Sequence, residues 1–378
     1  MTKHIFIPLF ILLTVALHAK NTTTITSKAK HDYIAKSLFN QIKQQVKEET
    51  AEEMKQKVIT YKEFKMPYDY ITYGEKPTDG HSLYISMHGG GNTSAKSNDR
   101  QWKNQLKLYR PKEGIYLAPR APTNSWDLWH KPHISEMFSR LIDRFVAHHD
   151  ININKVYILG YSAGGDGVYR LAPRMADRWA GAAMMAGHPG EAQDYNLMNL
   201  PYILQVGGKD TAYNRHKKCA NWKVRLEQKA KEHPGHYPHK VIIYPEYGHG
   251  MRNDCKVALP WMAKNSRKPW PKKIIWHQDN VPQTRFAWLT NDAPTKNDLI
   301  KAEVDGQTIT LETQNVQHIT LRLHEALIDL DKEILVEDHN GKQLFKGKVK
   351  RSRETIEKSL RDRLDLTSVA KAELKISL

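Results

Sequence analysis

The residue of this sequence best placed for nucleophilic chemistry is Ser162, the centre of the pentapeptide GYSAG at residues 160–164. The pentapeptide follows the apolar run VYILG and precedes a stretch in which Val168 and Leu171 recur with helical spacing. A serine on a sharp strand-to-helix turn keeps its hydroxyl exposed, and small residues two positions away relieve the crowding of that turn. The pattern predicts a nucleophilic serine, and a glycine-rich turn without chemistry is the alternative.

A second glycine-rich segment, HGGGN at residues 88–92, follows the apolar run SLYISM. Glycines here allow the backbone to turn over the serine and to point amide N–H groups at a developing oxyanion. We expect the donors to be the amides of Gly90, Gly91 and Ala163, and we expect His88 to be structural. Phosphate binding is the competing interpretation, but the glycines form neither the GxxxxGK[ST] pattern of a P-loop nor a GxGxxG pattern with a downstream acid.

Between residues 58 and 271, short apolar runs alternate with longer amphipathic segments. The runs predict buried strands at residues 82–87, 114–118, 156–160, 182–186, 201–206 and 240–244. Apolar residues from Ile134 to Val146 recur with the spacing of a helix over residues 134–149, and a second helix is expected around Trp222. This alternation predicts an α/β fold, with a mostly parallel sheet covered on both faces.

Residues 272–378 have a different pattern and predict a β-rich, sandwich-like accessory domain. Short strands are expected at residues 309–313, 318–323, 333–337, 343–349 and 372–376. The pair Asn340-Gly341 predicts a hairpin, because both residue types tolerate a positive φ. One helix is expected near residues 353–363, and a proline- and lysine-rich cluster at residues 269–273 marks the boundary with the preceding domain.

The N-terminus predicts export. Residues 1–19 combine the basic Lys3, an apolar stretch of 13 residues and the small residue Ala19, which is the pattern of a signal peptide. An uncleaved anchor helix is the alternative, but the stretch is shorter than the roughly 20 residues that span a bilayer. Residues 20–57 are highly charged and predict a solvated helical segment. We therefore expect a periplasmic or extracellular protein without a stable membrane span.

The composition limits the classes of partner. The chain has 378 residues and a formal net charge of +17, which excludes an acidic disordered protein. The basic residues are scattered and no nucleic-acid motif accompanies them, so we expect a solvated basic face and no nucleic acid. An acidic polysaccharide or an anionic membrane surface is the alternative partner. No HExxH or CxxC pattern predicts a metal.

The segments HGGGN, GYSAGG and Ala118-Pro119-Arg120, the last followed by Trp126 and Trp129, resemble the α/β-hydrolase superfamily. Within it, the sequence is most similar to secreted carboxylesterases and polyhydroxyalkanoate-depolymerase-like enzymes, a branch that overlaps acyl-protein-thioesterase-like and prolyl-oligopeptidase-like hydrolases. The resemblance covers roughly residues 61–262. It implies a three-layer core, a catalytic triad in the order serine, acid, histidine, and no cofactor.

This order assigns the two partners of Ser162. Asp210 follows the expected strand at residues 201–206, and His249 follows the one at residues 240–244. The resemblance implies that His249 accepts the serine proton and that Asp210 orients the imidazole. Weaker candidates for the acid are Asp194 and Glu246, whereas Asp166 lies too near the serine in sequence.

Three residues could line a substrate pocket. Trp126 and Trp129 lie in a polar loop and could form a platform for an acyl chain, an aromatic acid or a sugar ring. An equal alternative is that they cap the core beneath that loop. His188 follows a predicted core strand and could also line the pocket.

The two cysteines of the chain, Cys219 and Cys255, are too few for a disulfide-dense scaffold or a four-thiolate zinc site. Cys255 lies shortly after His249, and Cys219 lies on the expected helix around Trp222. In an exported protein a disulfide between them could tie the histidine loop to that helix.

The sequence thus predicts an exported serine hydrolase that cleaves carboxylic esters, with an ester on a polysaccharide or polymer as one possible substrate. A prolyl-oligopeptidase-like serine peptidase is the first alternative. A polymer-binding protein with an inactive hydrolase core is the second. The acyl group, the role of the accessory domain and the oligomeric state are left open by the sequence.

Overall fold

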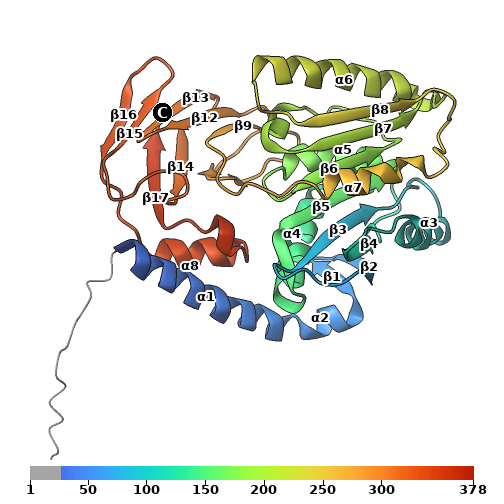
Figure 1. Ribbon diagram of the computed structural model, residues 1–378, viewed down its shortest axis with the longest axis horizontal. Coiled ribbons are helices and arrows are strands. Elements are labelled where there is room, and N and C mark those ends of the chain that lie inside the picture. Colours follow the sequence, from blue (N-terminus) through green and yellow to red (C-terminus); the bar gives the residue numbers. More distant parts are fainter. Residues whose placement is uncertain (1–26) are drawn as a thin grey trace, which may run out of the picture.

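The computed structural model describes residues 27–378, which form a layered core and a second, β-rich region beside it (Figure 1). The predicted signal peptide, residues 1–19, lies outside the described residues, as do the first residues of the charged segment. Over the described part of the chain, we find no helix with the length and apolar character that crossing a membrane requires.

The centre of the core is an eight-stranded sheet with the order β1-β2-β4-β3-β5-β6-β7-β8. Its strands are Val58–Tyr61 (β1), Phe64–Tyr73 (β2), His81–Met87 (β3), Gly114–Pro119 (β4), Ile151–Tyr161 (β5), Gly181–Met185 (β6), Tyr202–Gly207 (β7) and His239–Tyr244 (β8). β2 is antiparallel to β1 and β4, and the pairs from β4 to β8 are parallel. This is the sheet of the α/β-hydrolase fold, which confirms the predicted fold class.

Helices cover both faces of the sheet (Figure 1). The longer ones are Ala95–Leu108 (α3), Pro132–His148 (α4), Ala163–Arg174 (α5) and Arg215–Glu232 (α6), and a short one is Ala258–Met262 (α7). Buried side chains of α4, α5 and α6 belong to one apolar cluster, and those of α7 belong to another on the opposite face. The apolar runs form continuous strands because both faces of the sheet are buried.

The predicted disulfide is wrong. Cys219 and Cys255 are both free and buried. Cys219, on α6, belongs to the apolar cluster on one face of the sheet, and Cys255, just before α7, belongs to the cluster on the other face. The sheet therefore separates the two sulfur atoms, and no disulfide geometry is accessible to them.

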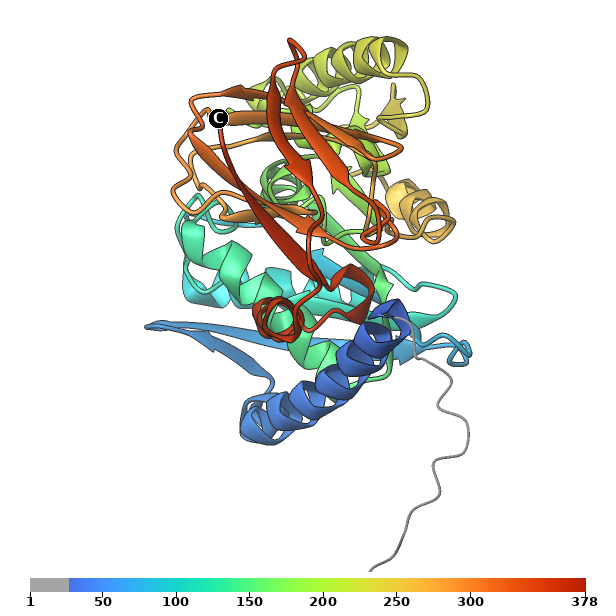
Figure 2. The same ribbon diagram turned by 90° about the vertical axis from the view of Figure 1, so that its left-hand side faces the viewer.

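The β-rich region consists of two sheets with an apolar core, as the sandwich-like prediction expects, and it faces the viewer in Figure 2. One sheet has the order β16-β15-β13-β12-β9 and the other β10-β11-β14-β17. The strands are Lys273–His277 (β9), Arg285–Phe286 (β10), Leu289–Thr290 (β11), Leu299–Asp305 (β12), Thr308–Gln314 (β13), His318–Leu323 (β14), Ile334–Asp338 (β15), Gln343–Gly347 (β16) and Ala372–Ser377 (β17). β15 and β16 form the predicted hairpin, with Gly341 at φ +82°.

Two helices at the N-terminal end of the described chain, Ser27–Glu49 (α1) and Ala51–Gln56 (α2), precede the core sheet. The solvated helix predicted from the charges is in fact partly buried, since Leu38 and Ile42 are shielded from solvent. α1 packs against α4 of the core and against Arg353–Asp362 (α8) of the β-rich region, and so bridges the two regions (Figures 1 and 2).

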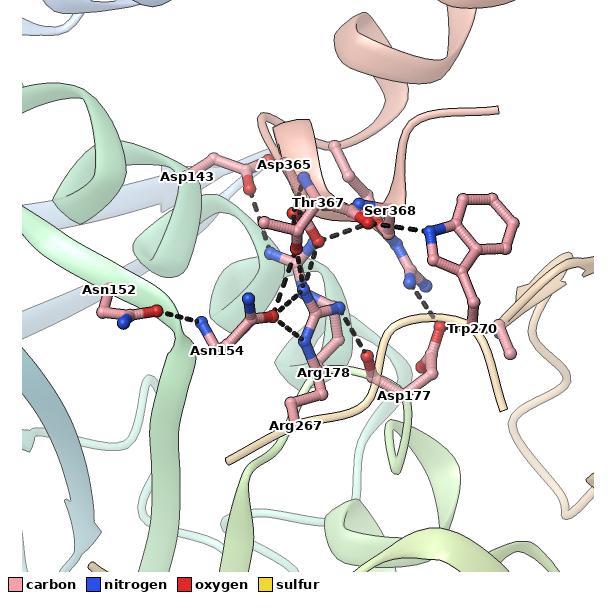
Figure 3. Close-up of polar contacts among 12 residues, drawn as sticks. Asp143, Asn152, Asn154, Asp177, Arg178, Arg267, Trp270, Asp365, Thr367 and Ser368 are labelled. Carbon is pink, nitrogen blue, oxygen red and sulfur yellow. Dashed lines mark hydrogen bonds and ion pairs between the residues drawn. The ribbon is translucent and has the colours of Figure 1, made fainter. Parts of the chain in front are cut away.

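A buried polar network also joins the two regions (Figure 3). Arg267, which follows α7, donates from Nη2 to Asp365 Oδ2 at 2.5 Å and to Asn154 Oδ1 at 2.9 Å. Asp365 is also held by Thr367 and Ser368 of its own turn. We call these five residues the interface network. Around it, Arg363 pairs with Asp177 and Arg178 pairs with Asp143.

Candidate active site

The turn between β5 and α5 carries Ser162 in a strained conformation, with φ +58° and ψ −121°. Its neighbours must be small. A Cβ atom on Gly164 would lie 2.1 Å from the carbonyl oxygen of Met87, and one on Gly160 would lie 2.3 Å from that of Gly164. Positions 160 and 164 therefore require glycine, because a side chain at either one would overlap neighbouring backbone atoms. The strained turn presents the serine hydroxyl at the edge of the sheet.

The three residues assigned from the order of the motifs lie together at the carboxyl ends of the parallel strands. His249 Nε2 lies 3.0 Å from Ser162 Oγ, and His249 Nδ1 lies 2.8 Å from Asp210 Oδ2. The Asp210 side chain, after β7, is buried, whereas the His249 side chain, after β8, is 43% exposed. A carboxylate, an imidazole and a hydroxyl in such a chain can transfer the serine proton to the histidine.

Other acids near these strands make structural contacts instead. Asp194 is fully buried and lies 2.8 Å from Arg225 Nε, and Glu246 pairs with Lys209 on the surface. Asp166 accepts the backbone N–H of His188 at 2.6 Å. Burial raises the pKa of Asp166 to about 6, and that hydrogen bond opposes the rise. None of these three acids is hydrogen-bonded to the imidazole of His249 in the described part of the chain, whereas Asp210 is.

Tyr161 fixes the loop that carries the histidine, a role that the sequence analysis missed. Its hydroxyl donates to the carbonyl oxygen of His249 at 2.5 Å and accepts the N–H of Met251 at 3.1 Å. Burial raises the pKa of Tyr161 to about 12, so the phenol stays protonated at neutral pH. One signal in the sequence could have indicated this role. The turn does not restrict the residue directly before the nucleophile, and this sequence has an aromatic residue with a hydroxyl there.

The glycine loop passes directly beside the nucleophile. A Cβ atom on Gly89 would lie 3.1 Å from Ser162 Cβ, and Gly90 and Gly91 have φ values of +105° and +86°. The N–H of Gly91 already donates to Asn98 Oδ1 at 2.9 Å, which corrects its expected role as an oxyanion donor. The N–H of Gly90 has no hydrogen-bond partner within residues 27–378, and that of Ala163 begins α5, where no intrahelical acceptor exists.

Asn98 anchors this loop. It is fully buried, and its Nδ2 donates to Asn124 Oδ1 at 2.9 Å. Arg120 donates to the same oxygen at 2.5 Å and pairs with Asp99 at 2.8 Å. The chain of contacts ties the glycine loop to the loop after β4, so the amide of Gly91 serves to position that loop.

His88 is structural, as predicted. Its Nε2 accepts the N–H of Ala121 at 3.1 Å, so its Nδ1 carries the proton and donates to the carbonyl oxygen of Gly89 at 2.6 Å. Burial lowers the pKa of His88 to about 4, which keeps the ring neutral. The ring therefore holds the first peptide of the glycine loop in one orientation.

The two tryptophans have different environments. Trp129 is completely buried and its Nε1 donates to the carbonyl oxygen of His88 at 3.0 Å, so it supports the glycine loop from below. Of the two alternatives, Trp129 therefore takes the one in which it caps the core beneath the loop, and it does not line the cavity at Ser162. Trp126 is 68% exposed and packs edge-on against His130, outside the lining of the cavity at Ser162.

His188 also lies outside that lining, contrary to expectation. Its Nδ1 accepts the N–H of Gly190 at 3.0 Å, and its own N–H donates to Asp166. The ring therefore shapes the turn after β6. Burial lowers the pKa of His188, assisted by the charges of Lys218 and Arg215.

A cavity of about 340 Å³ opens at the serine and the histidine. Its lining consists of Gly89, Gly90, Gln101, Asn104, Gln105, Leu108, Tyr161, Ser162, His249, Gly250, Met251, Arg252, Asn253 and Cys255. This volume is near the lower end for small-molecule sites. The lining combines the amide side chains of Gln101, Asn104, Gln105 and Asn253 with apolar surface such as that of Leu108 and Met251, so the cavity suits a small group with both polar and apolar parts.

One group of side chains in the described part of the chain has the spacing of metal ligands, namely Asp32, His324 and Glu325. Lys371 contacts both carboxylates and Arg351 lies 2.6 Å from Glu325, so cationic side chains already neutralise the group. None of these residues lines the cavity at Ser162.

No family model and no curated protein matches the sequence. Solved structures with a similar arrangement include a thermostable esterase, with 18% identity, a TM-score of 0.42 and coverage of 56% of this chain. The chain spans 62% of that protein, which is less than two thirds of its length. A carboxylesterase of Bacillus cereus has 16% identity and a TM-score of 0.41, with coverage of 53% of this chain and 94% of the other. A phospholipase/carboxylesterase of Dyadobacter fermentans DSM 18053 has 18% identity and a TM-score of 0.35, with coverage of 54% and 99%.

Proposed function

We propose that the protein is a serine hydrolase that cleaves carboxylic esters through an acyl-enzyme. The observation that carries the proposal is the hydrogen-bonded chain of Ser162, His249 and Asp210, built on a strained turn beside the glycine loop. Strained backbone is retained where function requires it. The open cavity at the serine provides the room for a substrate.

In this mechanism, Ser162 Oγ attacks the ester carbonyl while His249 Nε2 accepts its proton. The negative charge moves to the carbonyl oxygen, which the amides of Gly90 and Ala163 stabilise. His249 then gives the proton to the departing alkoxide, which leaves as an alcohol. A water molecule repeats the sequence on the acyl-serine, releases the carboxylic acid and restores the serine. Asp210 holds the imidazole in the required tautomer throughout.

The proposal is tested by the hydrolysis of p-nitrophenyl acetate and butyrate. Ser162→Ala should lower kcat by about 10⁴-fold or more, because the nucleophile is lost. Ser266→Ala, an exposed serine in the loop after α7, is the matched control and should keep the wild-type rate. Thermal unfolding of each variant verifies that it is folded. Equal rates for the wild type and a folded Ser162→Ala would contradict the proposal.

We also propose that residues 1–19 direct export and are then removed. The mature chain would begin at Lys20 and act in the periplasm or outside the cell. The intact mass of the protein recovered from the exported fraction measures this directly. A full-length mass, or retention in the cytoplasm, would contradict it.

A further inference from the structure

A second cavity, of about 830 Å³, adjoins the one at Ser162. Leu108, the last residue of α3, and Asn253, which follows the histidine loop, line both cavities. The two cavities are therefore adjacent, and we call them together the groove; its second part, the continuation, lies between the end of α3 and the start of α7. Apolar side chains lie along its continuation, namely Leu108, Pro111, Val257, Leu259 and Pro260.

The charged side chains that line this continuation are almost all positive. Lys107, Arg110, Lys112 and Lys256 line it, and all four side chains are exposed. Within residues 27–378 none of these four takes part in an ion pair, although many other basic residues of this chain do. The one acid in the lining, Glu113, accepts a hydrogen bond from Ser82 Oγ at 2.5 Å.

The part of the groove at the serine adds a further cation, from the same segment as His249. Arg252 lines the cavity at the serine and stacks over Tyr247, with its guanidinium 5.4 Å from the ring centroid. Arg252 and Asn253 have left-handed backbone conformations, with φ values of +47° and +64°. The histidine loop therefore presents positive charge in the part of the groove at the serine.

We propose that this groove binds the part of the substrate beyond the scissile ester, and that this part carries negative charge as carboxylate or sulfate groups. The proposal rests on the ester hydrolysis proposed above and names its substrate class. Uncompensated cations along a groove attract and retain an anionic chain, and the attraction weakens as salt screens it. The apolar side chains beneath them provide contact for sugar rings or similar spacers.

The test compares esters that differ in charge away from the scissile bond. The substrates are an O-acetylated oligogalacturonide for carboxylate, an O-acetylated sulfated oligosaccharide for sulfate, and an O-acetylated neutral xylo-oligosaccharide. The double variant K107E/K256E should raise KM for an anionic ester about tenfold or more, because two attractive charges become repulsive. It should leave the neutral ester and p-nitrophenyl acetate within about twofold, and about 0.5 M NaCl should reproduce the effect in the wild type.

The matched control is K96E/K103E, which reverses two exposed lysines of α3 that line neither cavity. This control should leave KM for all the esters unchanged. A wild type without preference for either anionic ester, or an equal effect of both double variants, would overturn the inference. A preference confined to one anion would identify the group that the groove binds.

Direct binding separates this inference from the proposed reaction. Isothermal titration of Ser162→Ala with oligogalacturonate that carries no ester should give a Kd that K107E/K256E raises about tenfold. If the wild type hydrolyses no ester but this binding remains, the hydrolase proposal fails and the anionic subsite stands. If esters are hydrolysed but no anion binds, the subsite fails and the hydrolase proposal stands.

Discussion

Two chains of polar side chains in this protein, the one at Ser162 and the interface network, use the same kinds of group in opposite ways. In the interface network, the Asp365 side chain is completely buried and receives hydrogen bonds from Arg267, Thr367 and Ser368. At the active site, His249 is 43% exposed and bonds one carboxylate and one hydroxyl. The buried Asp365, with several hydrogen bonds, holds two regions together. The partly exposed His249 keeps one side of its ring open towards a substrate.

The electrostatics follow the same division. Burial alone would raise the pKa of Asp365, but the charge of Arg267 and hydrogen bonds from Ser368 and Thr367 outweigh it and hold the pKa well below its usual value. The carboxylate thus stays charged and fixed. Asp210 is equally buried but meets Arg215 only at 3.7 Å, so its closest partner is the histidine that must accept a proton. The difference predicts that substitutions in the two chains affect different properties.

The largest difference between the effect on catalysis and the effect on stability is expected for His249→Ala. Loss of the general base should lower kcat for p-nitrophenyl acetate by about 10⁴-fold or more. Because the side chain is 43% exposed and its ring makes only an edge-on contact with Tyr161 among the described aromatic residues, the midpoint of thermal unfolding should change by no more than about 2 °C. His339→Ala, at the exposed turn between β15 and β16, is the control and should change neither quantity. A large loss of stability with retained kcat would contradict the comparison.

Asp365→Ala should show the converse. Removing the carboxylate leaves Arg267 buried without its charge partner, which should lower the free energy of unfolding by about 3–5 kcal/mol. The kcat of the folded variant should stay within about twofold of the wild type. The control is Asp362→Ala, whose carboxylate pairs with Lys358 on the exposed side of α8 and is worth about 1 kcal/mol or less. Urea denaturation measures both. Similar losses in the two variants would count against a structural role for the network.

A smaller, pH-dependent loss is expected for Glu325→Gln, because Glu325 is less deeply buried than Asp365. Burial opposes ionisation of Glu325, but hydrogen bonds from Lys371 and Arg351 prevail and lower its pKa to about 2 from 4.5. The lowered pKa stabilises the fold above pH 4.5, and this contribution is lost as pH falls towards 2. The wild type should thus exceed Glu325→Gln in unfolding free energy at pH 6 and lose that advantage by about pH 2. A difference that grows on acidification would have the wrong sign.

Tyr161→Phe should have the smallest effect. The variant loses the hydroxyl that joins the carbonyl of His249 to the N–H of Met251, and the histidine loop should become less well positioned. Such a contact is worth about 1 kcal/mol, so kcat should fall about tenfold or less. KM should stay unchanged, which distinguishes positioning from a loss of binding. Tyr33→Phe, on the exposed side of α1, is the control. An unchanged kcat would remove Tyr161 from the positioning residues.

Local patterns predicted the parts of the molecule that depend on neighbours in sequence. The buried parallel strands were found because each is a continuous apolar run. β2 was missed because its buried residues, Met66 and Tyr68, are separated by more exposed ones and it contains polar side chains such as Lys65, so it forms no continuous apolar run. The serine turn was predicted from the pentapeptide GYSAG and its place between an apolar run and a helical stretch, because the steric demand of that turn requires small residues at fixed positions.

Contacts between distant segments could not be predicted in this way. Asp365 and Arg267 meet across the boundary between the two regions, and neither has a neighbour in sequence that indicates the pairing. The same limit explains why the predicted disulfide was wrong. The separation of Cys219 and Cys255 in the sequence does not reveal that they lie on opposite faces of a sheet. Trp126 and Trp129 differ by three positions in one loop, yet only the fold decides that the second is buried.

Covalent labelling with a fluorophosphonate, followed by peptide mass spectrometry, tests the central claim most directly. The reagent reacts with a serine that an adjacent base activates. The wild type should carry one adduct per chain, on Ser162, and the adduct should be absent in Ser162→Ala and form far more slowly in His249→Ala. An adduct on another residue, or none on a folded wild type, would contradict the assignment of Ser162 as the nucleophile.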